Sequence, residues 1–251
     1  MLQLDLVAKG YLSEIFVSFQ GEGLYVGRRH LFLRLAGCHL RCAYCDTPGS
    51  LERGTTCVVH DHTGVSRQVD NPLSPTEAMA HALPILEAAG GLDGVAVTGG
   101  EPLLQADFLA ELLADARWPR PRLLETSGTL LDKLTAVLPV VDVVSMDIKL
   151  PSNTGEAAYW ETHERFLAAA GDKAYVKILL DNDTAEDELV RAAKLVRRAA
   201  RSAPVFLQPI TTSSGRIDLQ PANLQRFFLA ARRHVEDIRV LPQTHKFMGV
   251  Q

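Results

Sequence analysis

The sequence lacks several features that would assign it to well-defined classes of protein. It has only 4 cysteines among 251 residues, too few for the disulfide framework typical of small secreted domains. No apolar run approaches the roughly 20 residues that span a bilayer. The start of the chain, M-L-Q-L-D-L, lacks the basic and long apolar regions of a signal peptide. We therefore expect a cytoplasmic protein with reduced cysteines and no membrane segment.

The chain also has little excess charge of either sign. Its formal net charge is -4, which argues against a protein that coats nucleic acid, since such proteins are normally basic. Hydrophobic residues make up 47% of the chain, which is enough for a full core. Barrel-like α/β folds commonly reach this length undivided, so we expect a single domain over residues 1–251.

Three of the four cysteines, Cys38, Cys42 and Cys45, lie close together in the run G-C-H-L-R-C-A-Y-C-D-T. A structural 4Fe–4S cluster is usually held by four thiolates. The C-x3-C-x2-C spacing therefore predicts a cluster with one iron open to a non-protein ligand. A zinc site is the alternative, completed by His39 or Cys57, although such sites more often use two separated pairs of ligands.

Short apolar segments alternate with longer amphipathic segments. The predicted strands cover residues 14–19, 30–35, 94–98, 122–125, 142–146, 174–179, 204–208 and 237–240. The predicted helices cover residues 75–89, 106–116, 130–138, 156–170, 185–200 and 221–234. Patterns close to a capping box, at Ser74 and Thr184, indicate two of the helix starts. This order indicates parallel βαβ units in an α/β fold. A partial (β/α)6-type TIM barrel is the expected form, and a flavodoxin-like open sheet is the alternative.

Residues 49–73 interrupt this alternation. The segment has little periodicity, so we interpret it as a long irregular insertion within the domain. Cys57, His60, Asp61 and His62 cluster in it. A second metal site is one interpretation of this cluster, but a solvated loop is favoured, and we do not expect Cys57 to bind the main cluster.

Polar residues follow several of the predicted strands. In a parallel α/β barrel the active site gathers at the C-terminal ends of the strands, and such residues occur there at 98–102, 125–129, 145–149, 208–209 and 245–246. The first predicted strand ends in Gln20-Gly21-Glu22-Gly23. An amide and a carboxylate match the donor and acceptor edges of a pterin or purine, and buried hydrogen-bonding groups strongly reject analogues that lack their partners.

Together these motifs resemble 7-carboxy-7-deazaguanine synthases, which are radical S-adenosylmethionine (SAM) enzymes of the queuosine pathway of tRNA modification. The resemblance runs from E-I-F-x-S-x-Q-G-E-G through R-L-A-G-C-H-L-R-C-x-Y-C-D-T and T-G-G-E-P-L-L-Q to E-T-S-G-T, D-x-K and P-Q-T-H-K. It implies a carbon–nitrogen lyase that converts 6-carboxy-5,6,7,8-tetrahydropterin to 7-carboxy-7-deazaguanine with loss of ammonia. A 5′-deoxyadenosyl radical would abstract hydrogen from the substrate, and SAM would be regenerated.

The resemblance implies a role for each residue that matches a family motif. Cys38, Cys42 and Cys45 would bind the cluster, and Thr47, beside Asp46, would contact Mg²⁺, a hard cation that prefers oxygen ligands. The implied substrate-binding residues are Gln20, Gly21, Glu22, Arg34, Thr98, His245 and Gln251. The implied SAM contacts are Tyr44, Gly100, Glu101, Thr126, Ser145, Lys149 and Gln208. Two features depart from the family pattern: the long segment at 49–73, and Ser127, where relatives often have Asn.

The resemblance also implies an external electron donor such as flavodoxin, and a homodimer. Two alternatives remain open. A glycyl-radical-enzyme activase would share the cysteine loop but act on a protein backbone, whereas the Q-G-E-G and C-D-T motifs favour a small pterin. A zinc-binding module without catalysis is the alternative from another class.

Overall fold

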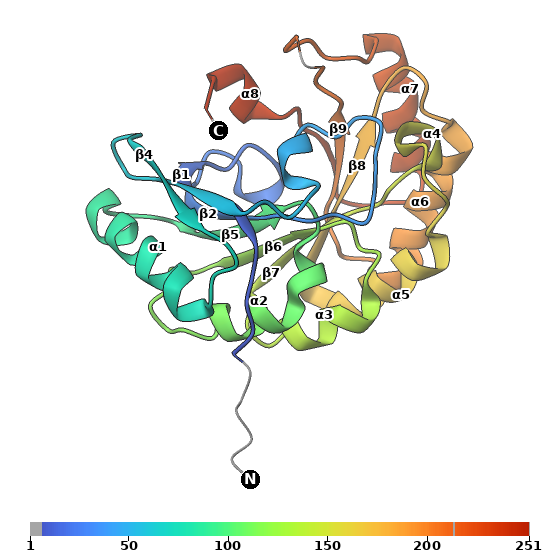
Figure 1. The fold of residues 1–251 in the computed structure, drawn as a ribbon. Coiled ribbons are helices and arrows are strands. Elements are labelled where there is room, and N and C mark those ends of the chain that lie inside the picture. Colours follow the sequence, from blue (N-terminus) through green and yellow to red (C-terminus); the bar gives the residue numbers. More distant parts are fainter. Residues whose placement is uncertain (1–6, 213, 251) are drawn as a thin grey trace.

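A single ten-stranded sheet organises the protein (Figure 1). The computed structural model describes residues 7–212 and 214–250. The strand order is β10-β9-β8-β7-β6-β5-β2-β1-β3-β4. Strands β2 and β5 to β10 are parallel, and β1 is antiparallel to β2. The strands are β1 Leu12–Phe19, β2 Arg29–Leu35, β3 Thr56–His60, β4 Ser66–Asp70, β5 Gly94–Gly99, β6 Arg122–Thr126, β7 Val143–Asp147, β8 Ala174–Leu180, β9 Val205–Pro209 and β10 Ile238–Val240.

The main helices form one layer on the outer face of the curved sheet (Figure 1), and each packs against the next along the chain. Flavodoxin-like folds have helices on both faces of the sheet, so the one-sided layer confirms the partial barrel. No helix in the described ranges is long and apolar enough to cross a membrane. The helices are α1 Pro75–Ala89, α2 Ala106–Leu113, α3 Leu131–Val137, α4 Pro151–Thr154, α5 Trp160–Ala170, α6 Glu186–Ala199, α7 Pro221–Arg232 and α8 Thr244–Met248, with short 3-10 turns η1 Gly23–Tyr25, η2 Pro48–Ser50, η3 Pro102–Gln105 and η4 Gly171–Lys173.

The two predicted capping boxes have different outcomes. At α1, Ser74 Oγ accepts a hydrogen bond from the Glu77 amide at 3.3 Å, and the Glu77 carboxylate accepts one from the Ser74 amide at 2.8 Å. This capping box is confirmed. At α6 the predicted start is correct to within one residue, but the predicted cap is wrong, because the helix begins at Glu186 with Ala185 as its N-cap. Thr184 instead accepts a hydrogen bond from the Asp181 amide, closing the turn before the helix.

The segment at 49–73 is not an irregular loop throughout, so that interpretation is wrong for residues 56–70. Strands β3 and β4 form an antiparallel hairpin that adds to β1 at the edge of the sheet. Cys57 and Val59 are buried in the core while the residues between and around them are more exposed. Asp61 closes the hairpin turn by accepting hydrogen bonds from the Thr63 and Val65 amides. A short strand with only two buried side chains gave too weak a periodic signal to be predicted.

A second apolar cluster fills the concave face of the sheet. Its members are Phe16, Phe32, Ala96, Leu123, Tyr175 and Phe206. They alternate along their strands with residues of the main core between sheet and helices, because successive strand side chains point to opposite faces. The Phe16 and Phe32 rings stack with their centroids 5.0 Å apart. These two rings form an apolar part of the wall of the cavity described next.

Candidate active site

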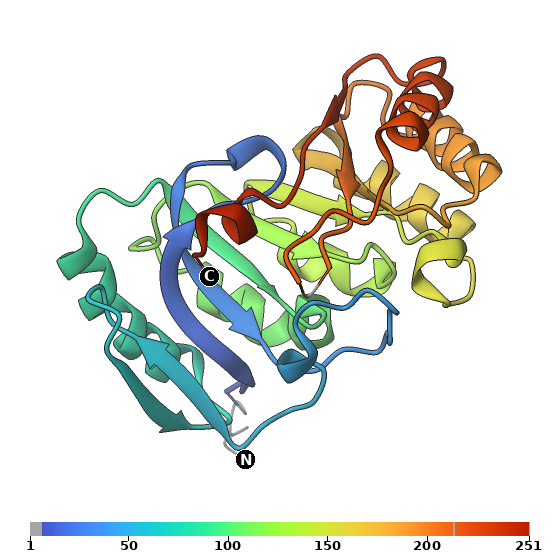
Figure 2. The ribbon, with the colours of Figure 1, turned by 90° about the horizontal axis from the view of Figure 1, so that it is seen from above.

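A cavity of about 420 Å³ opens at the C-terminal ends of the parallel strands. Figure 2 shows the C-terminal helix α8 beside β1 and β2, at the rim of this region. Glu101 and Ser145 are buried but do not line the cavity, and Gln251 lies outside the described residues. The other predicted site residues all lie on the cavity wall: Gln20, Gly21, Glu22, Arg34, Cys38, Cys42, Tyr44, Cys45, Thr47, Thr98, Gly100, Thr126, Lys149, Gln208 and His245.

The cysteine loop follows β2 and is fixed by backbone hydrogen bonds at both ends. The Cys38 amide donates to the Leu51 carbonyl at 3.0 Å, and the Ala43 amide donates to the Thr154 carbonyl at 3.0 Å. Burial raises the pKa of the Cys38 and Cys42 thiols. Lys149 acts in the opposite direction on both thiols, but burial outweighs it, so they are poor nucleophiles and become good ligands once a metal replaces the proton.

The three thiols fit an iron–sulfur cluster better than a single metal ion. In the described part of the chain, no group of three or more His, Cys, Asp or Glu side chains is arranged to hold one metal ion. Each thiolate of a cube binds a different iron, so three soft sulfur donors need only face one cavity, as Cys38, Cys42 and Cys45 do. Cys57 lies in the core of β3, away from this wall.

The paired glycines Gly99 and Gly100, at the end of β5, allow the cysteine loop to approach the sheet. A side chain at Gly99 would place its Cβ 2.1 Å from the Leu35 carbonyl oxygen, and one at Gly100 would place it 2.2 Å from the Gly37 carbonyl oxygen. Gly99 also has a positive φ of 122°, which glycine adopts without strain. These glycines therefore bring the backbone of the strand end directly against the residue before Cys38.

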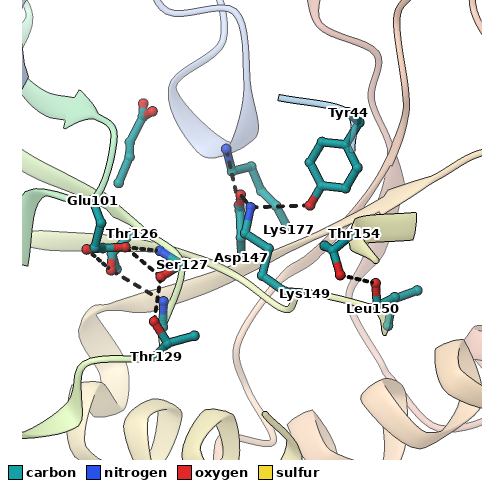
Figure 3. Close-up of polar contacts among 12 residues, drawn as sticks. Tyr44, Glu101, Thr126, Ser127, Thr129, Asp147, Lys149, Leu150, Thr154 and Lys177 are labelled. Carbon is teal, nitrogen blue, oxygen red and sulfur yellow. Dashed lines mark hydrogen bonds and ion pairs between the residues drawn. The ribbon is translucent and has the colours of Figure 1, made fainter. Parts of the chain in front are cut away.

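Glu101 joins the ends of β5 and β6 rather than pointing into the cavity (Figure 3). Its carboxylate accepts hydrogen bonds from Thr126 Oγ1 at 2.8 Å, Ser127 N at 2.8 Å and Ser127 Oγ at 2.6 Å. His163, buried beneath in α5, donates through Nε2 to the Ser127 carbonyl at 3.1 Å. Ser127, which departs from the family pattern, is thus part of the network that fixes this turn.

A second group of side chains meets across three strands. Gln20 donates to Glu125 Oε1 at 2.9 Å, and Thr98 donates to Glu125 Oε2 at 2.8 Å. All three residues lie on the cavity wall. The sequence placed Glu125 at a strand end but predicted no role for it. Nothing in E-T-S-G-T alone shows that its carboxylate accepts hydrogen bonds from two side chains elsewhere in the chain.

Opposite charges alternate along one side of the cavity (Figure 3). The Lys177 ammonium forms a short ion pair with Glu22 and lies 3.3 Å from Asp147 Oδ1. Asp147 Oδ2 is 2.8 Å from Lys149 Nζ, which lies 3.3 Å from Tyr44 Oη. Burial alone would raise the pKa of Glu22 and Asp147, but the lysines outweigh it, so the pKa of each carboxyl is lowered.

Lys177 was missed by sequence reasoning. It lies inside β8, in the otherwise uncharged run A-Y-V-K-I-L-L. Burial alone would lower its pKa, but Asp147, Glu22 and Glu125 outweigh it and hold the pKa of Lys177 well above its ordinary value. A lone lysine in an apolar strand could have indicated a site residue, because a lysine is buried only when its charge is paired with other groups.

The C-terminal segment closes over the Q-G-E-G turn. Gly21 is required here, because a Cβ would lie 1.9 Å from His245 Nδ1. Gln243 donates to Glu22 Oε1 at 2.8 Å and to Asp46 Oδ2 at 3.0 Å. Lys246 also pairs with Asp46, at 2.8 Å. The segment therefore connects the strand end at Glu22 with the loop that carries Cys45.

Arg34, also on the cavity wall, is held by its neighbour in β1. Its Nε donates to Glu14 Oε2 at 2.7 Å, and its guanidinium carbon lies 5.1 Å from the centre of the Phe16 ring. Arg34 and Glu14 are direct partners in the register of β1 and β2. This pairing orients the guanidinium while the side chain still lines the cavity.

The one-sided barrel and its three-cysteine loop define a radical SAM protein, and the sequence model described as Radical SAM superfamily matches residues 33–179. The fold is similar to that of QueE from Escherichia coli, with a TM-score of 0.60, 20% identity and 94% of both chains covered. The chain belongs to the 7-carboxy-7-deazaguanine synthase family. It is 36% identical to the synthase of Geobacter sulfurreducens over 242 residues, covering 95% of this chain and 96% of that protein.

A second synthase agrees with this assignment, and a further solved structure shares the fold. The synthase of Methanopyrus kandleri is 33% identical over 239 residues, covering 94% of this chain and 92% of that protein. A radical SAM methyltransferase from Sphaerobacter thermophilus shares the fold with a TM-score of 0.57 at 14% identity, covering 92% of this chain and 77% of that one. The family resemblance predicted from the sequence is confirmed, and a zinc-binding module without catalysis does not account for these matches.

Proposed function

We propose that this protein converts 6-carboxy-5,6,7,8-tetrahydropterin to 7-carboxy-7-deazaguanine with loss of ammonia and catalytic use of SAM, as the name of its relatives suggests. One observation supports this most directly. The three cysteines and the Gln20–Glu125–Thr98 unit line one cavity. A cofactor bound by the first and a pterin bound by the second would lie within reach of each other.

We name two parts of the cavity by these proposed roles. The cofactor half comprises Cys38, Cys42 and Cys45 with the Glu101-supported turn at Thr126. When bound in this half, a 4Fe–4S cluster and SAM would supply the radical chemistry that removes hydrogen from the substrate. In this half the chain's own residues fix the cysteine loop, and Tyr44, Gly100, Lys149 and Gln208 offer polar groups to SAM.

The substrate half comprises Gln20, Glu22, Thr98 and Glu125. Amide, hydroxyl and carboxylate groups in a buried wall match the donors and acceptors of a pterin ring, and leaving any of them unpaired would be costly. Arg34 supplies a guanidinium for the substrate carboxylate. His245 and the rest of the C-terminal segment cover the ring and limit access of water to it.

Mg²⁺ binding near Thr47 is part of the proposal. Thr47 follows Asp46 directly and lies on the cavity wall. Hydroxyl and carboxylate oxygens suit Mg²⁺, which keeps several waters and needs few protein ligands. The ion would lie beside the cysteine loop and could reach a substrate carboxylate held by Arg34.

Four further properties concern the protein as a whole rather than its cavity. We propose an external electron donor such as flavodoxin, a homodimer, a cytoplasmic location and a single domain. The last is supported by the one sheet that all ten described strands share. The exposed apolar side chains of Leu24 in η1 and of Phe247 and Met248 in α8 support association with another chain.

The experiment that tests the proposed function uses anaerobically reconstituted protein with reductant, SAM, Mg²⁺ and 6-carboxytetrahydropterin. We expect about four irons per chain, and 7-carboxy-7-deazaguanine identified by its mass. A glycyl-radical activase would cleave SAM without forming the deazaguanine. Stoichiometric zinc with no cluster would contradict the proposal altogether.

A further inference from the structure

Lys177 has an environment that its place in a core strand does not explain. Its side chain is 6% exposed, and its ammonium contacts the carboxylates of Glu22 and Asp147. A lysine retained for packing alone would extend its charge to the surface. Lys177 instead directs its charge to the cavity wall, where both carboxylates also lie.

The two partners of Lys177 belong to different halves of the cavity. Glu22 follows β1 in the substrate half and is also held by Gln243. Asp147 ends β7 and pairs with Lys149, which reaches Tyr44 beside Cys45. Figure 3 shows Lys177, Asp147, Lys149 and Tyr44 as one continuous series of contacts. Lys177 is therefore the ionic link between the two halves, beside the hydrogen-bonded link that Gln243 makes between Glu22 and Asp46.

Because Lys177 lies between two carboxylates, its charge constrains the positions of both Glu22 and Asp147. Buried ions are tolerated only when they are paired and hydrogen-bonded. Without Lys177, Glu22 and Asp147 would be two neighbouring buried carboxylates that repel each other, and the pKa of each would rise. Glu22 would then adopt a different position or become protonated, while Gln243 alone could not supply the missing positive charge.

We propose that Lys177 is a positioning residue that fixes Glu22 toward the pterin and, through Asp147, fixes Lys149 toward SAM. This inference rests on the proposed function for its substrate. It extends that function by assigning the alignment of both ligands to a residue that need not contact the reacting atoms.

The experiment compares Lys177→Met and Lys177→Arg with a control, Lys173→Met. Lys173 precedes β8 and donates to the Leu138 and Val141 carbonyls, away from the cavity. The ligands are 6-carboxypterin, followed by its fluorescence, and SAM, followed by equilibrium dialysis, with anaerobically reconstituted protein.

For Lys177→Met we expect the Kd for the pterin to rise about tenfold or more, as for other hydrogen bonds to charged groups. The Kd for SAM should rise by a smaller factor because Lys149 still holds Asp147. Lys177→Arg should recover part of both losses, and Lys173→Met should change neither.

A double variant distinguishes positioning from a general structural loss. If Lys177 acts through Glu22, Lys177→Met should cost much less pterin affinity in a Glu22→Gln background than in the wild type. Additive losses, or wild-type affinity for both ligands in Lys177→Met, would overturn the inference. Failure of the proposed function looks different: the wild-type protein would bind SAM but no pterin. In that case unchanged SAM affinity in Lys177→Met would still refute the role of Lys177.

Discussion

The cofactor half and the substrate half of the cavity are built in different ways. In the cofactor half, Cys38, Cys42 and Cys45 lie on one short loop. Glu101 and Ser127 there hydrogen-bond to each other and fix the backbone between the ends of β5 and β6. In the substrate half, side chains from separate parts of the chain meet directly, as Gln20 after β1 and Glu125 in β6 do across 105 residues. This difference agrees with the proposed roles, in which the cofactor half holds the radical source on a fixed backbone and the substrate half selects the molecule on which it acts.

Loss of one cysteine should have the largest effect and remove both functions together. In Cys42→Ala the cluster would keep only two protein thiolates, so we expect loss of cluster assembly, SAM cleavage and product. Iron and sulfide content and the absorbance of the reconstituted protein measure the outcome. Cys57→Ala is the matched control, since Cys57 lies in the core away from the cavity. A Cys42→Ala protein that still cleaves SAM would contradict the ligand assignment.

Changing Glu22 should separate the two halves. Glu22→Gln keeps the size of the side chain but removes the charge that pairs with Lys177. We expect product formation to fall about 10- to 100-fold, the range for a lost hydrogen bond to a charged group. SAM cleavage without product should continue near its wild-type rate. Equal loss of both, measured by chromatography of 5′-deoxyadenosine and deazaguanine, would mean that Glu22 does not belong to the substrate half.

Changing Glu101 should weaken SAM binding but not pterin binding, and the effect should be smaller than that of changing Glu22. In Glu101→Gln an amide NH₂ would replace one carboxylate oxygen that now accepts from Thr126 or Ser127. We expect the Kd for SAM to rise about tenfold through the displaced turn, with pterin affinity little changed. Glu87→Gln, an exposed position on α1, is the control. If pterin affinity falls as much as SAM affinity, the two halves are not separately supported.

His163 should affect stability with pH rather than catalysis at neutral pH. Burial lowers the pKa of His163 from 6.5 to about 4. As pH falls below 6.5, the unfolded chain binds this proton first, so the stability contribution is complete above pH 6.5 and declines toward pH 4. For this group the loss at pH 5 is about 2 kcal/mol. Urea unfolding at pH 7 and pH 5 should show a smaller pH difference for His163→Gln than for the wild type; an unchanged difference would contradict it.

The contrast between the halves also explains what the sequence could predict. The cysteine loop and the Gly99–Gly100 pair are each a short continuous run of sequence, and the residue types and spacing within each run are enough to predict its function. The alternation of strands and helices likewise predicted the partial barrel, and the capping box at Ser74 gave the start of α1. Such features are local, so the chain order alone contains them.

Features that depend on distant contacts were not predictable in the same way. The role of Lys177 depends on Glu22, which lies 155 residues earlier in the chain. Gln243 meets Glu22 across 221 residues. Helix α8 and the hairpin of β3 and β4 were also missed, because each is short and is stabilised by its tertiary neighbours rather than by its own periodicity.

The number of 7-carboxy-7-deazaguanine molecules formed per SAM consumed tests the central claim most directly. If the two halves align a pterin with the radical source in one cavity, SAM is regenerated and many products form for each SAM lost. The wild-type protein with reductant, Mg²⁺ and 6-carboxytetrahydropterin should therefore give a ratio far above one. Steady consumption of SAM with no deazaguanine would contradict the account.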